Sequence, residues 1–268
     1  MVALENTAGD TVAAHATRPI LRLADVSVTY AGGTAALSPL SLDLSDREVT
    51  VLLGPSGAGK STLLRSLNLL VRPSTGQVVS RAHGALEDAK AVRAHRRETA
   101  MIFQQHQLIG RLSALQNVLT GRLGRHSFWR TLAPFSEPER RLALACLDRV
   151  GLFEKALSRC DALSGGQQQR VGIARALAQE PRMVLADEPV ASLDPASSER
   201  VLTLLRNICK EDAIPVVISL HQLEYARQFA DRIVGLSAGR IVFDDVPARL
   251  DEAALTAIYG RAPAAAAP

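Results

Sequence analysis

A glycine-rich segment between a short apolar run and a helical pattern constrains the fold of this chain more than any other feature. The apolar run covers residues 49–53, and the segment that follows, residues 54–62, reads GPSGAGKST. Apolar residues then recur at helical spacing, at Leu63, Leu64, Leu67 and Val71. Strand, loop and helix in this order are the context in which the pattern G-x-x-x-x-G-K-[ST] predicts a phosphate-binding loop.

The residue types in this loop suit a nucleoside triphosphate with magnesium. Glycines let backbone amides point at phosphate oxygens, which a side chain at Gly57 or Gly59 would obstruct. The positive end of the following helix acts at the same place. Lys60 can reach the β- and γ-phosphates, and the Ser61 hydroxyl can hold Mg²⁺. The predicted nucleotide-binding residues are therefore Gly54, Pro55, Ser56, Gly57, Ala58, Gly59, Lys60, Ser61 and Thr62.

Composition and charge indicate an ordinary globular protein. Of 268 residues, 47% are hydrophobic and 22% charged, and the net charge is +4. The basic residues are not concentrated in one block, so no nucleic-acid partner is predicted, although a weak attraction to an anionic membrane surface is allowed. Three cysteines without C-x-x-C spacing fit a reducing compartment. We recognise neither a signal peptide nor a run of about 20 apolar residues, which predicts a cytoplasmic location or the cytoplasmic side of another structure.

Alternating apolar residues predict an antiparallel β layer near the N-terminus. The alternation covers residues 21–30 and 40–44, with a bulge expected near Asp25. A hairpin is predicted near the other end of the chain, from residues 232–236 and 240–243.

Continuous apolar runs at 49–53, 183–186 and 215–220 instead indicate strands that are covered on both faces. Because these strands alternate with helical segments, we predict an α/β fold with a mostly parallel core sheet. Short strands are expected in residues 77–103, around a basic patch that is interpreted as a solvated face, namely Lys90, Arg93, Arg96 and Arg97. Residues 106–160 have a helical pattern, and in the stretch 139–150 an apolar stripe is expected from Leu142, Ala145 and Leu147.

The expected organisation is one domain over residues 19–255. A helical subdomain at about 106–165 is inserted into its α/β core because no strand interrupts that region. Residues 1–18 are predicted to form a loose leader and residues 256–268 a disordered tail.

Two acidic residues follow the apolar run 183–186. Asp187 would lie at the carboxyl end of a strand, where open α/β sheets bind ligands, and could hold Mg²⁺ together with Ser61. Glu188 could polarise the attacking water. The alternative, that both only cap a loop, is disfavoured by the phosphate-binding loop upstream.

Other polar residues gain meaning from this context. His221 follows the apolar run 215–220, where a lone histidine is more often structural, but a contact to the γ-phosphate becomes the better hypothesis here. Gln104 or Gln105 could orient water or metal, and the sequence leaves open which of the two acts. Tyr30 could stack on an adenine, although an exposed or core tyrosine would have the same pattern.

A second anion-binding element is predicted at Ser164, Gly165, Gly166 and Gln167, which open a helix. One chain does not need two phosphate-binding elements for one nucleotide. A two-fold dimer resolves this, because the second element of each chain can then cover the nucleotide of the other.

Residues 20–250 resemble the ATP-binding subunits of ABC transporters. Gly54 to Ser61 matches Walker A, Leu163 to Gln167 the signature, and Met183 to Asp187 Walker B, with Glu188 in the catalytic-base position. Gln104 matches the Q-loop, and residues 192–194 (Ser192, Leu193 and Asp194) match the D-loop. His221 matches the switch histidine, and Tyr30 matches the adenine-stacking aromatic residue. The resemblance implies the P-loop NTPase fold and a head-to-tail dimer with two ATPs at its interface. It also implies that the catalytic residues are Glu188, His221 and Gln104, that Ser61, Asp187 and Gln104 are the metal ligands, and that Asp194 is a further nucleotide-site residue.

Within that family, short segments look like the phosphonate importer ATPases. They are Ile102 to Gln105, Gly110 to Ser113, Asn117 to Leu119, Gly121 to Arg125, the neighbourhood of Trp129 and Arg130, and Ser219 to Gln222. Two residues depart from the family pattern. Arg47 precedes Glu48 where glycine is more usual, and His106 stands where phenylalanine is frequent, in the segment expected to face the permease.

The resemblance implies an ATP-hydrolysing subunit of a phosphonate importer. Its expected cofactors are ATP and Mg²⁺, and its expected partners are a second copy of the chain, permease subunits and, indirectly, a substrate-binding protein. Its expected place is the cytoplasmic face of the inner membrane, as a peripheral subunit. The alternatives are another cargo (phosphate, phosphite or a polar amino acid) and a soluble ABC-type ATPase that is not part of a transporter.

Overall fold

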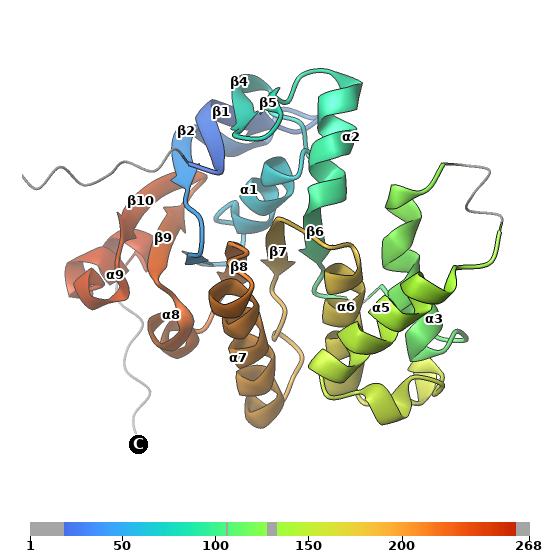
Figure 1. Ribbon diagram of the computed structural model, residues 1–268. Coiled ribbons are helices and arrows are strands. Elements are labelled where there is room, and N and C mark those ends of the chain that lie inside the picture. Colours follow the sequence, from blue (N-terminus) through green and yellow to red (C-terminus); the bar gives the residue numbers. More distant parts are fainter. Residues whose placement is uncertain (1–18, 106, 128–132, 261–268) are drawn as a thin grey trace, which may run out of the picture.

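The computed structural model describes residues 19–105, 107–127 and 133–260 (Figure 1). The predicted leader, His106, Trp129, Arg130 and the last eight residues of the predicted tail lie outside these ranges.

The core of the fold is a six-stranded sheet with the strand order β10-β9-β3-β8-β7-β6. Strands β9, β3, β8, β7 and β6 are parallel, and β10 pairs antiparallel with β9 at the edge. The bounds are β3 Val49–Leu53, β6 Thr99–Ile102, β7 Met183–Asp187, β8 Val216–Leu220, β9 Arg232–Ser237 and β10 Arg240–Asp245. The predictions of a mostly parallel α/β core and of a hairpin after residue 231 are confirmed.

A second, antiparallel sheet has the order β2-β1-β4-β5. Its strands are β1 Leu21–Thr29, β2 Ala35–Leu44, β4 Thr75–Ser80 and β5 Gly84–Ala85. The pairing of β1 with β2 shifts register between Leu23 and Val26, and Asp25 between them has a φ of 52°. The predicted bulge therefore lies where the apolar alternation changes phase, which keeps both Leu23 and Val26 in the core.

Helices cover both faces of the core sheet (Figure 1). The α-helices are α1 Lys60–Leu67, α2 Ala89–Glu98, α3 Ala114–Leu119, α5 Glu137–Arg149, α6 Gly165–Ala178, α7 Pro195–Glu211, α8 Leu223–Phe229 and α9 Glu252–Tyr259. The described residues also form short 3₁₀ helices, η1 Thr120–Arg125, η2 Phe153–Lys155, η3 Cys160–Ala162 and η4 Pro247–Arg249. Helices α3, α5 and α6 lie together at one side of the molecule (Figure 1).

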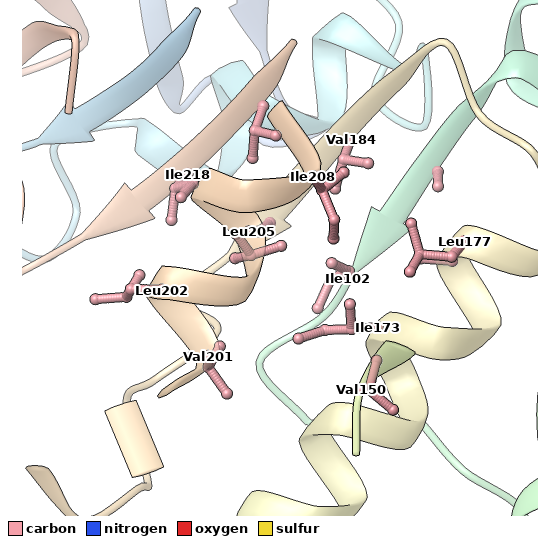
Figure 2. Close-up of a cluster of buried hydrophobic side chains, with 14 of the residues drawn as sticks. Ile102, Val150, Ile173, Leu177, Val184, Val201, Leu202, Leu205, Ile208 and Ile218 are labelled. Carbon is pink, nitrogen blue, oxygen red and sulfur yellow. The ribbon is translucent and has the colours of Figure 1, made fainter. Parts of the chain in front are cut away.

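The continuously apolar strands contribute side chains to two hydrophobic clusters, one on each face of the core sheet. Val51 and Leu53 of β3 belong to the cluster under α6 and α7, where Ile173, Leu205 and Ile218 also meet (Figure 2). The alternate residue Leu52 belongs to the other cluster, which packs α1 between the two sheets. Because neighbouring side chains of a strand point to opposite faces, both must be apolar here.

Three sequence-based expectations are wrong in detail. Short strands do occur in residues 77–103, as β4, β5 and β6, but the basic residues 90–97 between them lie on helix α2, which that expectation omits. Asp88 starts this helix by accepting hydrogen bonds from the amides of Lys90 and Ala91. The buried stripe of α5 consists of Ala143, Cys146 and Leu147, while Ala145 is exposed. Residues 256–259 belong to helix α9 with Ile258 fully buried, so the expected boundary of the tail at 256 lies inside a packed helix.

Arg47 occupies a left-handed backbone conformation, with a φ of 56°. This conformation favours glycine, the residue that is more usual here, so the turn before β3 keeps its shape at some backbone cost. Within the described residues, no helix combines the length and apolar character needed to cross a membrane.

Candidate functional site

The loop from Gly54 to Gly59 joins β3 to α1 and depends on two glycines. Gly54 and Gly59 have positive φ angles of 155° and 102°. A Cβ on Gly54 would meet the carbonyl oxygen of Leu236 at 2.3 Å, and one on Gly59 would meet that of Ala36 at 2.8 Å. Backbone from β9 and β2 thus presses on the loop and fixes its course.

Helix α1 begins directly after Gly59, and no side chain caps its start. The first amides of a helix have no partner within it, and the helix dipole makes this end positive. Ser56 and Gly57 of the loop are exposed in front of this end. The site therefore offers unpaired N–H groups to an anion, as the sequence predicts for phosphates.

Lys60 connects the loop to His221 and Glu188. Its ammonium is buried and donates to the carbonyl oxygens of Gly54 (2.7 Å) and Pro55 (3.1 Å), and to Nδ1 of His221 (3.4 Å). An ammonium group has donors only, so Nδ1 accepts and the proton of a neutral imidazole is on Nε2. That nitrogen donates to the Glu188 carboxylate.

Ser61 and Asp187 lie together at the carboxyl ends of the strands. The Ser61 hydroxyl donates to Oδ1 of Asp187 at 2.8 Å, and Arg65 of α1 contacts Oδ2 at 3.2 Å. Asp187 is 4% exposed. A buried carboxylate beside a hydroxyl offers the hard oxygen ligands that Mg²⁺ prefers.

These residues fit a magnesium-bound triphosphate better than a metal held by protein alone. Among the described residues, no group of three or more His, Cys, Asp or Glu side chains is arranged to hold a metal ion. Mg²⁺ is commonly bound through one or two carboxylates plus substrate phosphates. Ser61 and Asp187 would supply the protein ligands of such an ion, and the loop amides would supply the phosphate contacts.

Tyr30 and the glutamines lie at the edge of this site. Tyr30 is 42% exposed, and its hydroxyl lies 3.1 Å from that of Thr62, in the first turn of α1. The Tyr30 side chain therefore lies beside the start of α1 and is partly exposed. Gln104 and Gln105 are exposed in the bend after β6, and the choice between them stays open.

The second anion-binding element begins helix α6. Ser164 and Gln167 form a capping box, in which the Gln167 amide donates to the Ser164 hydroxyl at 3.4 Å. Asp194 caps α7, and hydrogen bonds from Ser197 lower the pKa of its carboxyl. A Cβ on Gly166 would meet the Ser197 hydroxyl at 2.9 Å. The signature residues therefore pack against the start of α7, and no described contact joins them to the loop at Gly54 to Gly59 of the same chain.

Sequence reasoning missed two residues of the site. Arg65 and Ser219 both bond the Asp187 carboxylate. Arg65 lies one helical turn after Ser61, a spacing that places both on one face of α1 and could have indicated it. Ser219 lies inside the continuously buried strand β8, so no local pattern marks it as a residue of the site.

The fold and the loop together define a P-loop NTPase. The family model for ABC transporters matches residues 37–191. The phosphite import ATP-binding protein PxtA of Stutzerimonas stutzeri is 62% identical over 240 residues, 90% of this chain and 87% of its own. The phosphonates import ATP-binding protein PhnC 3 of a Nostoc species is 57% identical, over 91% of this chain and 93% of its own.

Solved structures agree with this assignment. The dimeric, post-hydrolysis structure of an ATP-binding cassette bound to ADP and Pi is 35% identical, has a TM-score of 0.74 and spans 85% of this chain and 98% of that one. Another match is cbiO1 from Clostridium perfringens, part of the ABC transporter complex cbiONQ, with 28% identity, a TM-score of 0.77, and coverage of 87% and 91%. This chain belongs to the ABC transporter family, and it is an ABC-type ATPase that binds ATP.

Proposed function

We propose that this chain is the ATP-hydrolysing subunit of an importer for phosphonates, bound as a peripheral subunit to the cytoplasmic face of the inner membrane. The main structural support for ATP hydrolysis is a cluster of polar side chains at one end of the core sheet, formed by Lys60, Ser61, Asp187, Glu188 and His221. Relatives named for phosphonate import support the cargo.

Each residue of the cluster has a task in this proposal. Lys60 and the loop amides bind the phosphates. Ser61, Asp187 and the exposed Gln104 would hold Mg²⁺, which would neutralise phosphate charge when bound. Glu188 accepts a proton from the attacking water, and its contact with Nε2–H of His221 sets the direction of the carboxylate. Gln104 and His221 contact the γ-phosphate, and Tyr30 stacks on the adenine.

A second copy completes the site in this proposal. Ser164, Gly165, Gly166 and Gln167 of one chain would cover the γ-phosphate held by the loop of its partner, with Asp194 nearby. The dimeric ATP-binding cassettes among the solved relatives support this arrangement. ATP then acts as the bridge between two chains, and hydrolysis releases them.

The permease is proposed to contact the surface beside the Gln104 bend. A cavity of about 530 Å³ lies there, with Phe103 and Gln107 from the bend among its lining residues. Five described lining residues are arginines and none is Asp or Glu; the arginines are Arg93, Arg96, Arg97, Arg125 and Arg175. Arg175 of α6 donates to the carbonyl of Gln107 at 2.7 Å, so movement here can reach the helix that begins with the signature.

A second cargo, phosphite, is favoured by one specific observation: the relative named for phosphite import is 62% identical, against 57% for the phosphonate relative quoted above. Phosphate or a polar amino acid gains no such support.

The test is ATP hydrolysis by the chain reconstituted with its permease in vesicles. We expect the binding protein loaded with a phosphonate to stimulate hydrolysis severalfold, with the Glu188→Gln complex as the inactive control. Stimulation by the phosphite-loaded protein alone would establish the second cargo. No stimulation by either would contradict the import proposal, while ATP binding would still be expected.

A further inference from the structure

Ser219 connects the two acidic residues of the site through one hydroxyl. It lies in β8 directly opposite Asp187 of β7, and it is fully buried. The Ser219 hydroxyl donates to Oδ1 of Asp187 at 3.0 Å and accepts the backbone N–H of Glu188 at 2.9 Å. One side chain thus holds the carboxylate of one residue and the backbone of the next.

The backbone of Glu188 needs such support. Its φ of 48° is in the left-handed region, which is unfavourable for a residue with a Cβ. Asp187 and Ser219 form the last pair of the ladder between β7 and β8. Past that pair the Glu188 amide bonds the Ser219 hydroxyl in place of a strand carbonyl. The hydroxyl therefore keeps the chain turned so that the Glu188 side chain reaches His221.

The same hydroxyl matters for the proposed metal ligand. Oδ1 of Asp187 accepts from both Ser61 and Ser219. If the Ser61 hydroxyl turns to a metal, Ser219 remains as the donor that keeps this carboxylate in place, with Arg65 on its other oxygen. A carboxylate held by a buried donor keeps its orientation, as partners of metal ligands generally do.

We propose that Ser219 is a positioning residue for ATP hydrolysis, which fixes Asp187 and Glu188 relative to each other. The proposal rests on the proposed roles of these two residues. In this proposal Ser219 contacts neither the nucleotide nor the attacking water, and it acts only through its hydrogen bonds to Asp187 and Glu188.

A purely structural role is the competing explanation, because any buried hydroxyl needs partners. The two explanations differ in what Ser219→Ala changes. A structural role lowers stability and affects all kinetic constants through the loss of folded protein. A positioning role lowers kcat and the apparent affinity for Mg²⁺. The KM for ATP stays unchanged, because the substitution does not alter the phosphate-binding loop or Lys60.

The experiment compares Ser219→Ala with wild type, using the full chain assembled with its permease. We expect kcat to fall by about 10- to 100-fold, as for the loss of hydrogen bonds to a charged group. The Mg²⁺ concentration for half-maximal rate should rise severalfold, and the KM for ATP should change by less than about twofold. Ser219→Cys keeps nearly the same side-chain shape with weaker hydrogen bonds, so its kcat should lie between that of wild type and that of Ser219→Ala.

Thr50→Val is the matched control. Thr50 is a buried strand residue of the same sheet whose hydroxyl also donates to a carboxylate, that of Glu48 at 2.7 Å, but it lies in β3 away from the loop. Its kcat and Mg²⁺ dependence should equal those of wild type.

Wild-type kcat and Mg²⁺ dependence in Ser219→Ala or Ser219→Cys would overturn the proposal. An equal loss in Thr50→Val, or a loss that follows the melting temperature with no change in Mg²⁺ dependence, would do the same. Glu188→Gln is measured alongside. If that variant keeps wild-type turnover, the proposed role of Glu188 is contradicted. This outcome is distinguishable from one that contradicts only the positioning role of Ser219.

Discussion

At the scale of single residues, Lys60 has the most unusual environment. It is 4% exposed, and burial lowers the pKa of its ammonium, while the carboxylates of Glu188 and Asp187 act in the opposite direction. A buried cation is costly unless it is bonded, and here two loop carbonyls and His221 are its partners. Phosphate oxygens would be stronger partners because they carry charge.

We therefore expect Lys60→Met to weaken ATP binding without losing the fold. Removal of the buried charge offsets the loss of its hydrogen bonds, so melting without ATP should stay within about 5 °C of wild type. Affinity for ATP should fall by about 10- to 100-fold, measured by fluorescence titration or by the ATP-dependent shift in melting temperature. Lys155→Met, at an exposed position, is the control. Unchanged ATP affinity in Lys60→Met would contradict the role of Lys60.

The residues of the site could be predicted to different degrees. The phosphate-binding motif predicts Lys60 and Ser61, the apolar run before Asp187 predicts that residue at the same edge of the sheet, and the structure brings the three together. The bond from His221 to Glu188 and the hydroxyl of Ser219 depend on which strands become neighbours, which local patterns do not state. Ser219 also carries no polar pattern of its own, since a serine in a buried strand resembles any small core residue.

At the scale of elements, the start of α5 is anchored by a buried carboxylate. Burial raises the pKa of Glu139, but hydrogen bonds from the amide and hydroxyl of Ser136 and from His126 outweigh it and lower the pKa to about 2. The ordinary value is 4.5. A lowered pKa contributes stability that is complete above the ordinary value and is lost as the pH falls toward the folded value.

Glu139→Gln should therefore destabilise the chain by up to about 3 kcal/mol at neutral pH. The difference from wild type should shrink as the pH falls from 5 to 3, because the wild-type carboxylate becomes protonated on unfolding. Urea unfolding at several pH values measures this. Glu137→Gln, which breaks an exposed pair with Arg141 on the same helix, should cost little at any of them. If the difference in unfolding free energy between Glu139→Gln and wild type did not change with pH, the lowered pKa of Glu139 would be contradicted.

The elements themselves were predictable where one pattern dominates. The apolar runs at 49–53, 183–186 and 215–220 correspond to the central strands Val49–Leu53, Met183–Asp187 and Val216–Leu220. Helix α2 has no apolar stripe that would predict it, because half of its residues are charged and only Val92 and His95 are buried. Its signal was the capping residue Asp88 before a stretch of good helix formers.

At the scale of the whole molecule, the site is incomplete in one chain under the proposed function. Gly165 begins α6, where its amide would face the γ-phosphate of a second chain. A Cβ on Gly165 would meet Leu193 at an ordinary 3.8 Å. Gly165→Asp therefore fits its own chain, and its carboxylate would repel the partner's phosphate. That variant separates dimer contacts from folding.

The most direct measurement is the ATP-dependent association of Glu188→Gln, followed by sedimentation together with phosphate release. We predict a monomer without nucleotide, a dimer with ATP and Mg²⁺, and hydrolysis reduced by at least about 100-fold, because no base activates the water. Adding Gly165→Asp to this variant should abolish the dimer while ATP still binds. Wild-type turnover in Glu188→Gln, or a variant that binds ATP and stays monomeric, would contradict the account.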